Sequence, residues 1–546
     1  MLEKLYKKIT ENKKNTIIFI LILTLLSSIP VFIFPGIKKG DDTYFHLSRI
    51  CAISDNIKNL KIFSGVYPGY FNGYGYANGL FYPDIFLYIP AIATAIGLNV
   101  ITSYKIFLIL INLLSITSIY ISIKGISKNK YASILGSVIY AFASYRLVDM
   151  FERAALGETL AFIFAPLVIY GIYEIIFKNY KKFYILTIGM TGLILSHIVS
   201  TYMIGILLLI ICLINIKQLL KEKRILYLML AALLTLLLTS YFLLPMLEQM
   251  ISQTFYYSNT SNISEFELSK RTVPFYLLFL EIPNLRKAVF NKYWVPSGIG
   301  IIFIYFVYKK IKHKEIKDKF INQNFIIGIL FLILTTLTPF WNLNIVKKVL
   351  YPIQFPWRFY LIPTLLLTIS GSILISKIKE SKKLLRNTLI ISMISLISIF
   401  IISIIPSRIK NIVEYDASYA EYLPVEIDKD YIKERGTIIT SNNKVETSFK
   451  KTGTTMKIQF KQKDNDTYLE LPLIYYKGYE AIINKTNLET FKTENGLLGI
   501  KINDIKEGTI DVSYDGTTLS KTTKITSLIS LMIFTIYITK EVKYEK

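Results

Sequence analysis

Long apolar runs separated by short basic segments constrain this chain more than any other feature of its sequence. A membrane-spanning helix needs about 20 mostly apolar residues. Twelve runs approach that length and composition, near residues 16–34, 101–123, 131–145, 159–177, 183–197, 198–216, 225–247, 297–308, 325–340, 356–376, 387–406 and 523–539. The sequence therefore predicts a polytopic α-helical membrane protein with about 12 transmembrane helices.

A thirteenth apolar run, residues 84–100, contains Pro90 and has no charged flank. We interpret it as a helix that lies at the membrane interface or dips into it. Leaving it out of the count places seven segments on one side of the membrane. They hold nearly half of the 63 Lys and Arg residues and lie at 1–15, 124–130, 178–182, 217–224, 309–319, 377–386 and 540–546. Lys and Arg concentrate in cytoplasmic loops, so we expect a multi-pass plasma-membrane protein with both termini in the cytoplasm.

The overall composition is apolar and basic at once, with 52% hydrophobic residues, 18% charged residues and a formal net charge of +25. A typical soluble domain has about 25% charged residues. Because so much of the positive charge is explained by topology, we expect the lipid bilayer as a partner and no nucleic acid. The two cysteines argue against a disulfide scaffold. No P-loop, Gly-x-Gly-x-x-Gly, His-Glu-x-x-His or Cys-x-x-Cys motif occurs.

The periodicity of the sequence changes in the carboxy-terminal part. Residues 407–522 contain five short alternating runs, 445–450, 454–462, 467–476, 497–503 and 508–514, broken by Asn, Asp, Gly and Lys. This pattern predicts an extracytoplasmic β-sandwich-like domain. The predicted domains are a transmembrane part, 1–406, with a first outer loop at 35–100, the β domain at 407–522, and a final helix with a cytoplasmic tail at 523–546.

A loop rich in Gly and Tyr lies within the first outer loop, at residues 65–83. Glycine allows tight turns, and tyrosine offers a flat amphipathic ring. Such a loop could stack on sugar rings, or its tyrosines could form an aromatic belt near the membrane.

Most of the unusual polar residues fall on the predicted outer side. Asp41 and Asp42 follow the first span, and Asp42, His46 and Arg49 are spaced i, i+4 and i+7. This spacing places the last three on one stripe of a helix. An Asp at this position could instead simply cap the helix.

Three further stretches carry polar residues on the same side. Arg153 and Glu158 lie between two spans, His197 lies between two others, and Gln354 and Arg358 lie at the start of the tenth. An arginine at the interface can hold a phosphate with two hydrogen bonds. The plainer alternatives are a solvated turn with local ion pairs, an interfacial His cap and a snorkelling arginine.

These residues carry a resemblance to a known group of proteins. The chain resembles bacterial membrane proteins of the glycosyltransferase C (GT-C) superfamily, and more narrowly the "6-pyruvoyl-tetrahydropterin synthase-related" set. That set is similar to membrane glycosyltransferases that decorate lipoteichoic acid. The matching stretches are Asp41-Asp-Thr-Tyr-Phe-His-Leu-Ser-Arg-Ile50, Arg153-Ala-Ala-Leu-Gly-Glu158, Leu195-Ser-His197, Gln354-Phe-Pro-Trp-Arg-Phe359 and Leu471-Pro-Leu-Ile-Tyr-Tyr-Lys-Gly-Tyr479.

The resemblance implies an enzyme with its active face outside the membrane. A polyprenyl-phosphate-linked sugar would be the donor, and a cell-envelope glycan or teichoic-acid-like polymer the acceptor. Asp41 or Asp42 would be the catalytic base and could bind Mg²⁺ or Mn²⁺. The narrower set has one acidic residue after a His where this chain has two after Gly40, so which of the two acts is left open.

The remaining site residues would contact the substrates in this interpretation. They are His46, Arg49, Arg153, Glu158, His197, Gln354 and Arg358. Two other classes of function remain as alternatives. One is a transporter or flippase for an envelope polymer or lipid-linked precursor, and the other is a non-catalytic envelope-assembly protein.

Overall fold

The structure is a computed structural model. It describes residues 9–33, 35–258, 268–279, 296, 298–378, 408–409, 420–436, 439, 445–463 and 468–544. The residues form two compact units, each built from three stretches of chain. The first unit comprises Met1–Thr43, Tyr104–Thr235 and Phe266–Asn411, and the second comprises Tyr44–Ser103, Leu236–Glu265 and Ile412–Lys546. The domain limits predicted from the sequence were drawn at membrane crossings, whereas these two units are defined by contacts between residues. The predicted domain limits therefore stay predictions.

The first unit is almost entirely helical. Its longer helices are α2 (Lys13–Ser27), most of α7 (Val100–Ser127), α8 (Lys130–Ala141), α10 (Leu156–Phe177), α11 (Phe183–Ile194), α12 (Ile198–Ile214), the first part of α14 (Arg224–Ser252), α17 (Ile302–Lys312), α18 (Lys319–Leu334) and α21 (Leu361–Ile378). Shorter elements are α3 (Ile29–Phe32), α9 (Ser144–Leu147), the π-helix η2 (Val148–Arg153), η3 (Tyr180–Lys182), α13 (Ile216–Leu219), η5 (Leu268–Arg271), η6 (Phe275–Leu277), α19 (Thr338–Asn342), α20 (Asn344–Leu350), η7 (Tyr351–Ile353) and η8 (Pro356–Tyr360). Two short strands, β1 (Ile37–Lys38) and β2 (Arg408–Ile409), pair antiparallel.

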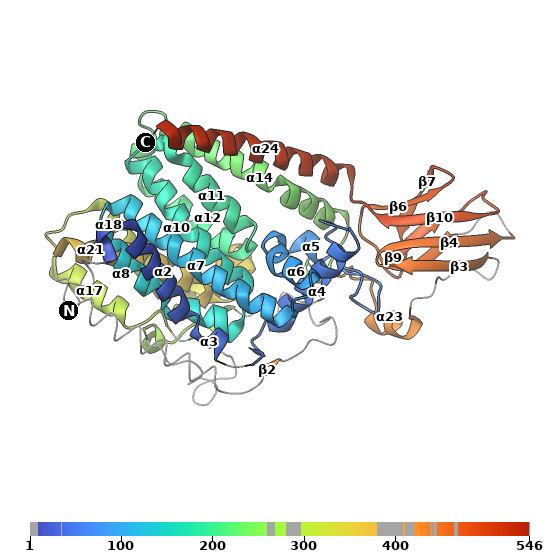
Figure 1. Cartoon of the computed structure of the whole chain (residues 1–546), viewed down its shortest axis with the longest axis horizontal. Coiled ribbons are helices and arrows are strands. Elements are labelled where there is room, and N and C mark those ends of the chain that lie inside the picture. Colours follow the sequence, from blue (N-terminus) through green and yellow to red (C-terminus); the bar gives the residue numbers. More distant parts are fainter. Residues whose placement is uncertain are drawn as a thin grey trace. The chain divides into compact units, whose positions relative to one another are not determined.

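Close helix packing positions the polar residues of this unit. Helices α10, α11 and α12 lie side by side (Figure 1). A Cβ atom at Gly171 of α10 would approach the backbone nitrogen of Leu186 to 2.3 Å, and one at Gly189 of α11 would approach that of Val168 to 2.8 Å. Glycines at both positions therefore allow α10 and α11 to approach closely, as small residues do in membrane helix pairs.

The predicted count of about 12 transmembrane helices is not supported. In the described part of the chain, five helices are long and apolar enough to cross a membrane, or six if the bent pair at 130–153 is one span. The five are Val100–Ser127, Leu156–Phe177, Arg224–Ser252, Pro356–Ile378 and Thr518–Glu541. The run predicted at 387–406 lies outside the described residues.

Several predicted runs correspond to helices too short to cross a membrane. The adjacent runs predicted at 183–197 and 198–216 correspond to α11 with 12 residues and α12 with 17, and His197 between them caps α12 by accepting a hydrogen bond from the Ser200 backbone nitrogen. The first run ends its helix at Ser27, just before Pro30 opens α3. A hydropathy profile counts apolar residues and does not show where a helix ends within an apolar run.

The second unit combines short helices, two long apolar helices and the β region. Its helices are α4 (Thr43–Lys58), α5 (Asn78–Phe81), η1 (Ile85–Leu87), α6 (Tyr88–Ala95), the second half of α14, η4 (Tyr256–Ser258), α23 (Lys429–Arg435) and α24 (Thr518–Tyr544). Helices α14 and α24 are joined by a hydrogen bond between the Ser240 and Ser527 hydroxyls at 2.9 Å. Elements α6 and η1 together give the apolar stretch Ile85–Ala95, which is shorter than a membrane crossing requires.

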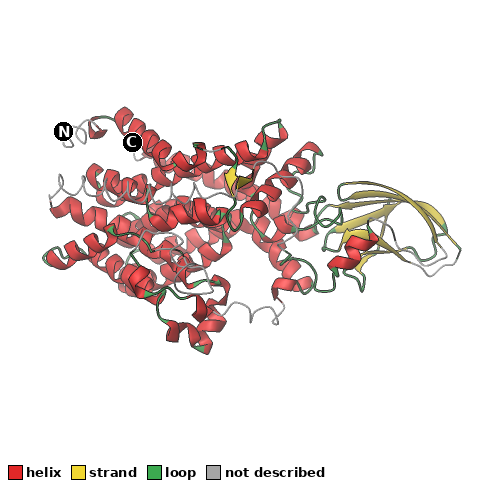
Figure 2. Ribbon diagram, turned by 90° about the horizontal axis from the view of Figure 1, so that it is seen from below, coloured by secondary structure: helices red, strands yellow, loops and turns green. Residues whose placement is uncertain are grey.

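The carboxy-terminal β region contains two antiparallel sheets (Figure 2). The strand order is β3-β4-β10-β6-β7 in the larger sheet and β5-β9-β8 in the smaller one. The strands are β3 (Val445–Thr452), β4 (Thr455–Gln462), β5 (Tyr468–Ile474), β6 (Tyr479–Ile483), β7 (Thr486–Leu488), β8 (Thr490–Lys492), β9 (Leu497–Lys501) and β10 (Glu507–Tyr514). The five predicted runs match β3, β4, β5, β9 and β10 to within a few residues, which confirms a β-sheet region there.

The Gly- and Tyr-rich loop at 65–83 is part of the core of the second unit. Tyr67, Tyr70, Tyr74 and Tyr76 are each at most 1% exposed. Tyr67 and Tyr76 pair across the loop through backbone hydrogen bonds of 2.8 and 3.0 Å. These four rings are buried packing residues, so they form neither an exposed aromatic belt nor an open stacking surface.

One partly buried lysine predicts a pH dependence of stability in this unit. The Lys451 ammonium donates to the backbone oxygens of Gly73 and Pro472, and burial lowers its pKa to about 8. An unfolded lysine has a pKa of about 10.4. Between these values the unfolded chain binds more protons, so the stability contributed by this group should rise as the pH increases from 8 to 10.

Thermal unfolding of the detergent-purified protein at several pH values checks this. The pH-dependent rise should be smaller in Lys451→Met than in the wild type. Lys450→Met is the control, because Lys450 is an exposed neighbour on the same strand. Equal slopes in all three proteins would contradict the prediction.

Candidate functional site

The Glu158 carboxylate is the centre of a buried hydrogen-bonded network in the first unit. One oxygen, Oε1, accepts from Nε of Arg358 at 2.7 Å. The other, Oε2, accepts from the Tyr145 hydroxyl at 2.8 Å and lies 3.0 Å from Nη1 of Arg153. Glu158 lies in the first turn of α10 and is 4% exposed. We call Tyr145, Asp149, Arg153, Glu158, Gln354 and Arg358 the Glu158 network.

Arg153 is held from two sides. Its Nη1 atom donates to Oδ1 of Asp149 at 2.6 Å, four residues earlier in the π-helix η2. The helix ends at Ala154, whose φ of 55° is left-handed, and the Ala155 backbone nitrogen returns to the Asp149 oxygen at 2.9 Å. This turn redirects the chain into α10 and brings Arg153 against Glu158.

Arg358 reaches the same carboxylate from a distant part of the sequence. It lies in the 3₁₀ helix η8, which begins with Pro356. Its Nη1 atom donates to Oε1 of Gln354 at 2.6 Å and to the Ile353 oxygen at 2.9 Å. The guanidinium is therefore fixed by one carboxylate, one amide and one backbone carbonyl.

The segment that carries Asp41 and Asp42 packs against the turn beside this network. The Asp42 backbone nitrogen donates to the Arg153 oxygen at 3.0 Å. A Cβ atom at Gly40 would lie 2.6 Å from the Glu152 oxygen, so only glycine allows this close approach. Lys38 forms an ion pair with Glu152 across the same contact. Asp41 is exposed and Asp42 is partly buried.

His197 is buried near the network but has a clear structural role. Its Nδ1 atom accepts from the Ser200 backbone nitrogen at 3.2 Å and lies 2.9 Å from the Ser200 hydroxyl. It is 6% exposed and lies within electrostatic reach of Glu158. The histidine is thus the cap of α12 and a neighbour of the acidic centre.

His46 and Arg49 belong to the second unit and pack there. The Nη2 atom of Arg49 donates to the backbone oxygens of Tyr82 and Pro83 at 3.0 and 2.8 Å, and the guanidinium carbon lies 4.4 Å from the Tyr82 ring centre. The His46 ring makes an edge contact with Tyr82. Both side chains are 1% exposed, so in this structure they anchor the Tyr82–Pro83 segment.

The Glu158 network places two carboxyl groups, of Asp149 and Glu158, against two guanidiniums, of Arg153 and Arg358. Burying such charges is costly unless each is paired and hydrogen-bonded. The pairing holds both guanidiniums in fixed orientations, and fixed cations can stabilise negative charge that develops on a substrate without first reorganising.

The sequence offered Asp41 and Asp42 as ligands for Mg²⁺ or Mn²⁺. Within the described residues, no three or more Asp, Glu, His or Cys side chains are grouped so that they could hold a metal ion. The described side chains therefore do not supply a metal-ligand set.

Sequence reasoning gave no site role to three neighbours of these residues. Tyr145 and Asp149 complete the Glu158 network, and Lys38 joins the Asp41–Asp42 segment to Glu152. Asp149 and Arg153 at i and i+4 were a usable signal for an ion pair. The π-helix and the left-handed Ala154 that join them had no sequence signature.

These features define a class: a membrane protein with transmembrane-capable helices, a carboxy-terminal β region and a buried network of acidic and arginine side chains. Residues 76–421, more than half of the chain, match the family described as bacterial membrane protein YfhO. The chain belongs to the YfhO family.

One relative is an uncharacterized protein of Lactococcus lactis subsp. cremoris (strain MG1363). It is 25% identical over 326 residues, which cover 56% of this chain and 50% of the relative. The chain thus spans about half the length of that relative.

Proposed function

We propose that this protein is an extracytoplasmic glycosyltransferase. It moves a sugar from a polyprenyl-phosphate carrier to a hydroxyl group of a cell-envelope acceptor such as a glycan or a teichoic-acid-like polymer. The observation that carries the proposal is the convergence of the Asp41–Asp42 segment, the η2–α10 turn and η8 on one carboxylate–arginine network. The resemblance of these same stretches to GT-C enzymes supports it.

The reaction is a single displacement at the anomeric carbon. The acceptor hydroxyl attacks that carbon while the bond to the carrier phosphate breaks, and the phosphate leaves with the bonding electrons. A carboxylate, Asp42 or Asp41, takes the proton as the new bond forms. Asp42 is the better candidate, because its backbone is fixed to Arg153.

Arg153 and Arg358 stabilise the charge that grows on the leaving phosphate. Glu158 acts through them as a positioning residue, since it fixes the orientation of both guanidiniums. Gln354 and His197 support the same arrangement, one through Arg358 and the other beside Glu158. His46 and Arg49 hold the Tyr82–Pro83 segment of the first outer loop.

A transfer assay tests the proposal. The purified protein is reconstituted in vesicles with a radiolabelled polyprenyl-phosphate hexose and a cell-envelope extract. The label should move from the lipid to the extract, and the double variant Asp41→Asn/Asp42→Asn should lose this transfer. Normal transfer by the double variant would rule out catalysis by either aspartate, and no transfer by the wild type would count against the enzyme itself.

The predicted orientation has its own test. In a chain whose native cysteines are replaced by serine, Lys314→Cys should be shielded from an impermeant maleimide in intact cells, and Lys485→Cys should be labelled. Both positions are exposed, one after α17 and one between β6 and β7. Labelling of the first and protection of the second would reverse the proposed orientation.

A further inference from the structure

The second unit contains a cavity of about 310 Å³. Its walls come from the loop after α4, residues 79–84, the second half of α14, and the segment that joins β10 to α24. None of the lining residues belongs to the Glu158 network. Ligand pockets measure roughly 300–1,000 Å³, so this cavity suits a group the size of one sugar ring.

The Gly- and Tyr-rich loop builds one wall of this cavity. The Tyr67 hydroxyl donates to Oδ2 of Asp84 at 2.5 Å. Gly79 lies so close that a Cβ atom there would approach the Tyr67 hydroxyl to 2.5 Å and Asp84 Oδ2 to 2.8 Å. Burial raises the pKa of Asp84, while the hydrogen bond from Tyr67 and the charge of Arg49 oppose that shift. The loop thus places a carboxyl group in the cavity wall.

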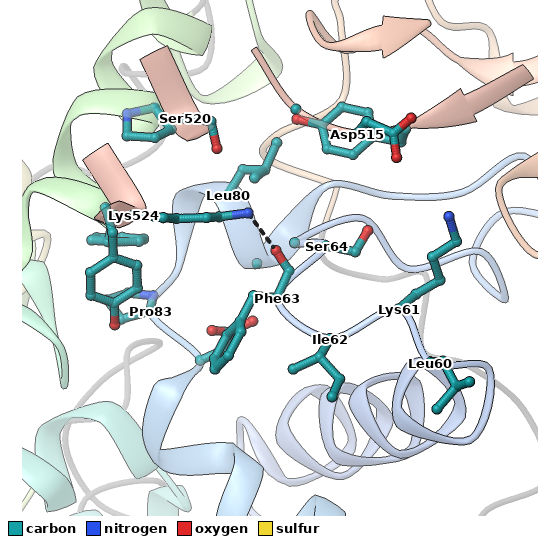
Figure 3. A pocket seen from close by; sticks show the side chains of 18 residues that line it. Leu60, Lys61, Ile62, Phe63, Ser64, Leu80, Pro83, Asp515, Ser520 and Lys524 are labelled. Atoms are coloured by element: carbon teal, nitrogen blue, oxygen red, sulfur yellow. Dashed lines mark hydrogen bonds between the residues drawn. The ribbon is translucent and has the colours of Figure 1, made fainter. Parts of the chain in front are cut away.

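The lining mixes aromatic rings with groups that bind hydroxyls. Phe63, Tyr241 and Tyr514 supply rings, and Asp515 and Lys524 supply opposite charges. Figure 3 shows Lys524 entering from one side, where its ammonium donates to the Phe63 oxygen at 3.2 Å, and Lys61 and Asp515 on the other. The wall holds two carboxyl groups and two lysine side chains, of Lys61 and Lys524. This mixture of acceptors and donors suits a neutral ligand with several hydroxyl groups.

Phe63 has an unusual backbone conformation. Its φ is 58°, a left-handed value that bulky residues rarely adopt. The Phe63 backbone nitrogen donates to the Tyr88 hydroxyl at 3.0 Å, and the centres of the two rings lie 4.9 Å apart. A strained backbone conformation of this kind persists only where the surrounding structure holds it in place. Here it turns the Phe63 ring to the cavity wall.

The cavity is bordered by exposed apolar side chains. Leu60 and Ile62, in the loop that lines the cavity, are 86% and 55% exposed. Beyond Lys524, α24 exposes an apolar surface that includes Ile525, Leu528, Ile529, Met532, Ile533 and Ile536. Exposed apolar surface on and beside a transmembrane-capable helix suits contact with lipid chains.

We propose that this cavity binds the hexosyl headgroup of a membrane glycolipid, with the lipid chains lying along α24. The aromatic rings would cover the sugar face, Asp515 and Asp84 would accept from its hydroxyls, and Lys524 would donate to them. This binding site is additional to the proposed transfer reaction and does not depend on it.

Titration of the full-length, detergent-purified protein with dioctanoyl glucosyl-glycerol tests the proposal. Phe63→Asn removes the ring but suits the left-handed backbone, because asparagine tolerates positive φ. We expect this variant to unfold at or above the wild-type temperature and to bind about tenfold more weakly. Lys524→Met should also bind about tenfold more weakly. The matched control is Lys521→Met, one turn away on α24, where Lys521 pairs with Glu480 outside the cavity.

Further ligands and variants test separately whether the ligand is a lipid, whether its headgroup is a sugar, and whether it binds in this cavity. Free methyl glucoside binding as tightly as the glucolipid would overturn the assignment to a lipid. Equal or tighter binding of dioctanoyl phosphatidylglycerol would overturn the assignment to a sugar. Unchanged affinity in both Phe63→Asn and Lys524→Met would overturn the location. Asp42→Asn should keep the wild-type affinity, so failure of this proposal and failure of sugar transfer are distinct results.

Discussion

Replacing Glu158 with alanine is expected to lower the free energy of unfolding by about 3–5 kcal/mol. The change leaves the buried guanidiniums of Arg153 and Arg358 without their shared carboxylate, and it removes the acceptor of the Tyr145 hydroxyl. Removing one partner of a buried ion pair costs this much because the remaining charge stays desolvated. Denaturant unfolding of the purified protein in detergent measures the effect.

Glu222→Ala is the matched control for this experiment. Glu222 also pairs with an arginine, Arg224, at 3.2 Å, but its side chain is 55% exposed. Because this carboxylate faces water and Arg224 keeps its bonds to the Ile175 and Lys178 backbone oxygens, the loss should be about 0–1 kcal/mol. A loss for Glu158→Ala no larger than the loss for Glu222→Ala would contradict the structural role assigned to the Glu158 network.

Asp42→Asn is expected to lower the rate of sugar transfer by about 10²–10⁴-fold, the usual contribution of a general base. The amide is similar in size to the carboxylate but cannot take the proton. Asp41→Asn should have a much smaller effect, because Asp41 is exposed whereas Asp42 is fixed by its backbone hydrogen bond to Arg153. Initial rates in the vesicle assay compare the two variants.

Asp55→Asn controls for the loss of a carboxylate. Asp55 of α4 has a half-exposed side chain that pairs with Lys58 at 3.8 Å, and its replacement should leave the transfer rate unchanged. Equal large losses in Asp41→Asn and Asp42→Asn would mean that both aspartates act. A large loss in Asp41→Asn alone would transfer the role of base to Asp41.

Much of the β region could be predicted from sequence, whereas helix lengths could not. Alternation along β4 and β10 is a local signal, and both strands appear within a residue of their predicted ends. The predicted limit between the runs 183–197 and 198–216 falls at His197, the cap of α12, but both helices end before these runs do, and hydropathy does not register where a helix ends.

The candidate site could be predicted in part. Arg153, Glu158 and Arg358 were singled out from sequence, and the structure brings them together. The ion pair between Asp149 and Arg153 depends on a π-helix and on the left-handed conformation of Ala154, and no sequence pattern predicted either of them. The positions of His46 and Arg49 depend on Tyr82, more than 30 residues away, so helical spacing alone could not reveal their packing.

The most direct test of the central claim is a count of products in the vesicle assay by mass spectrometry. We expect one molecule of free polyprenyl phosphate for each hexose joined to the acceptor, and both should disappear in the Asp41→Asn/Asp42→Asn double variant. Free hexose without acceptor-linked product would indicate hydrolysis. Carrier that crosses the membrane with its hexose still attached, and without any product, would contradict sugar transfer and favour a flippase.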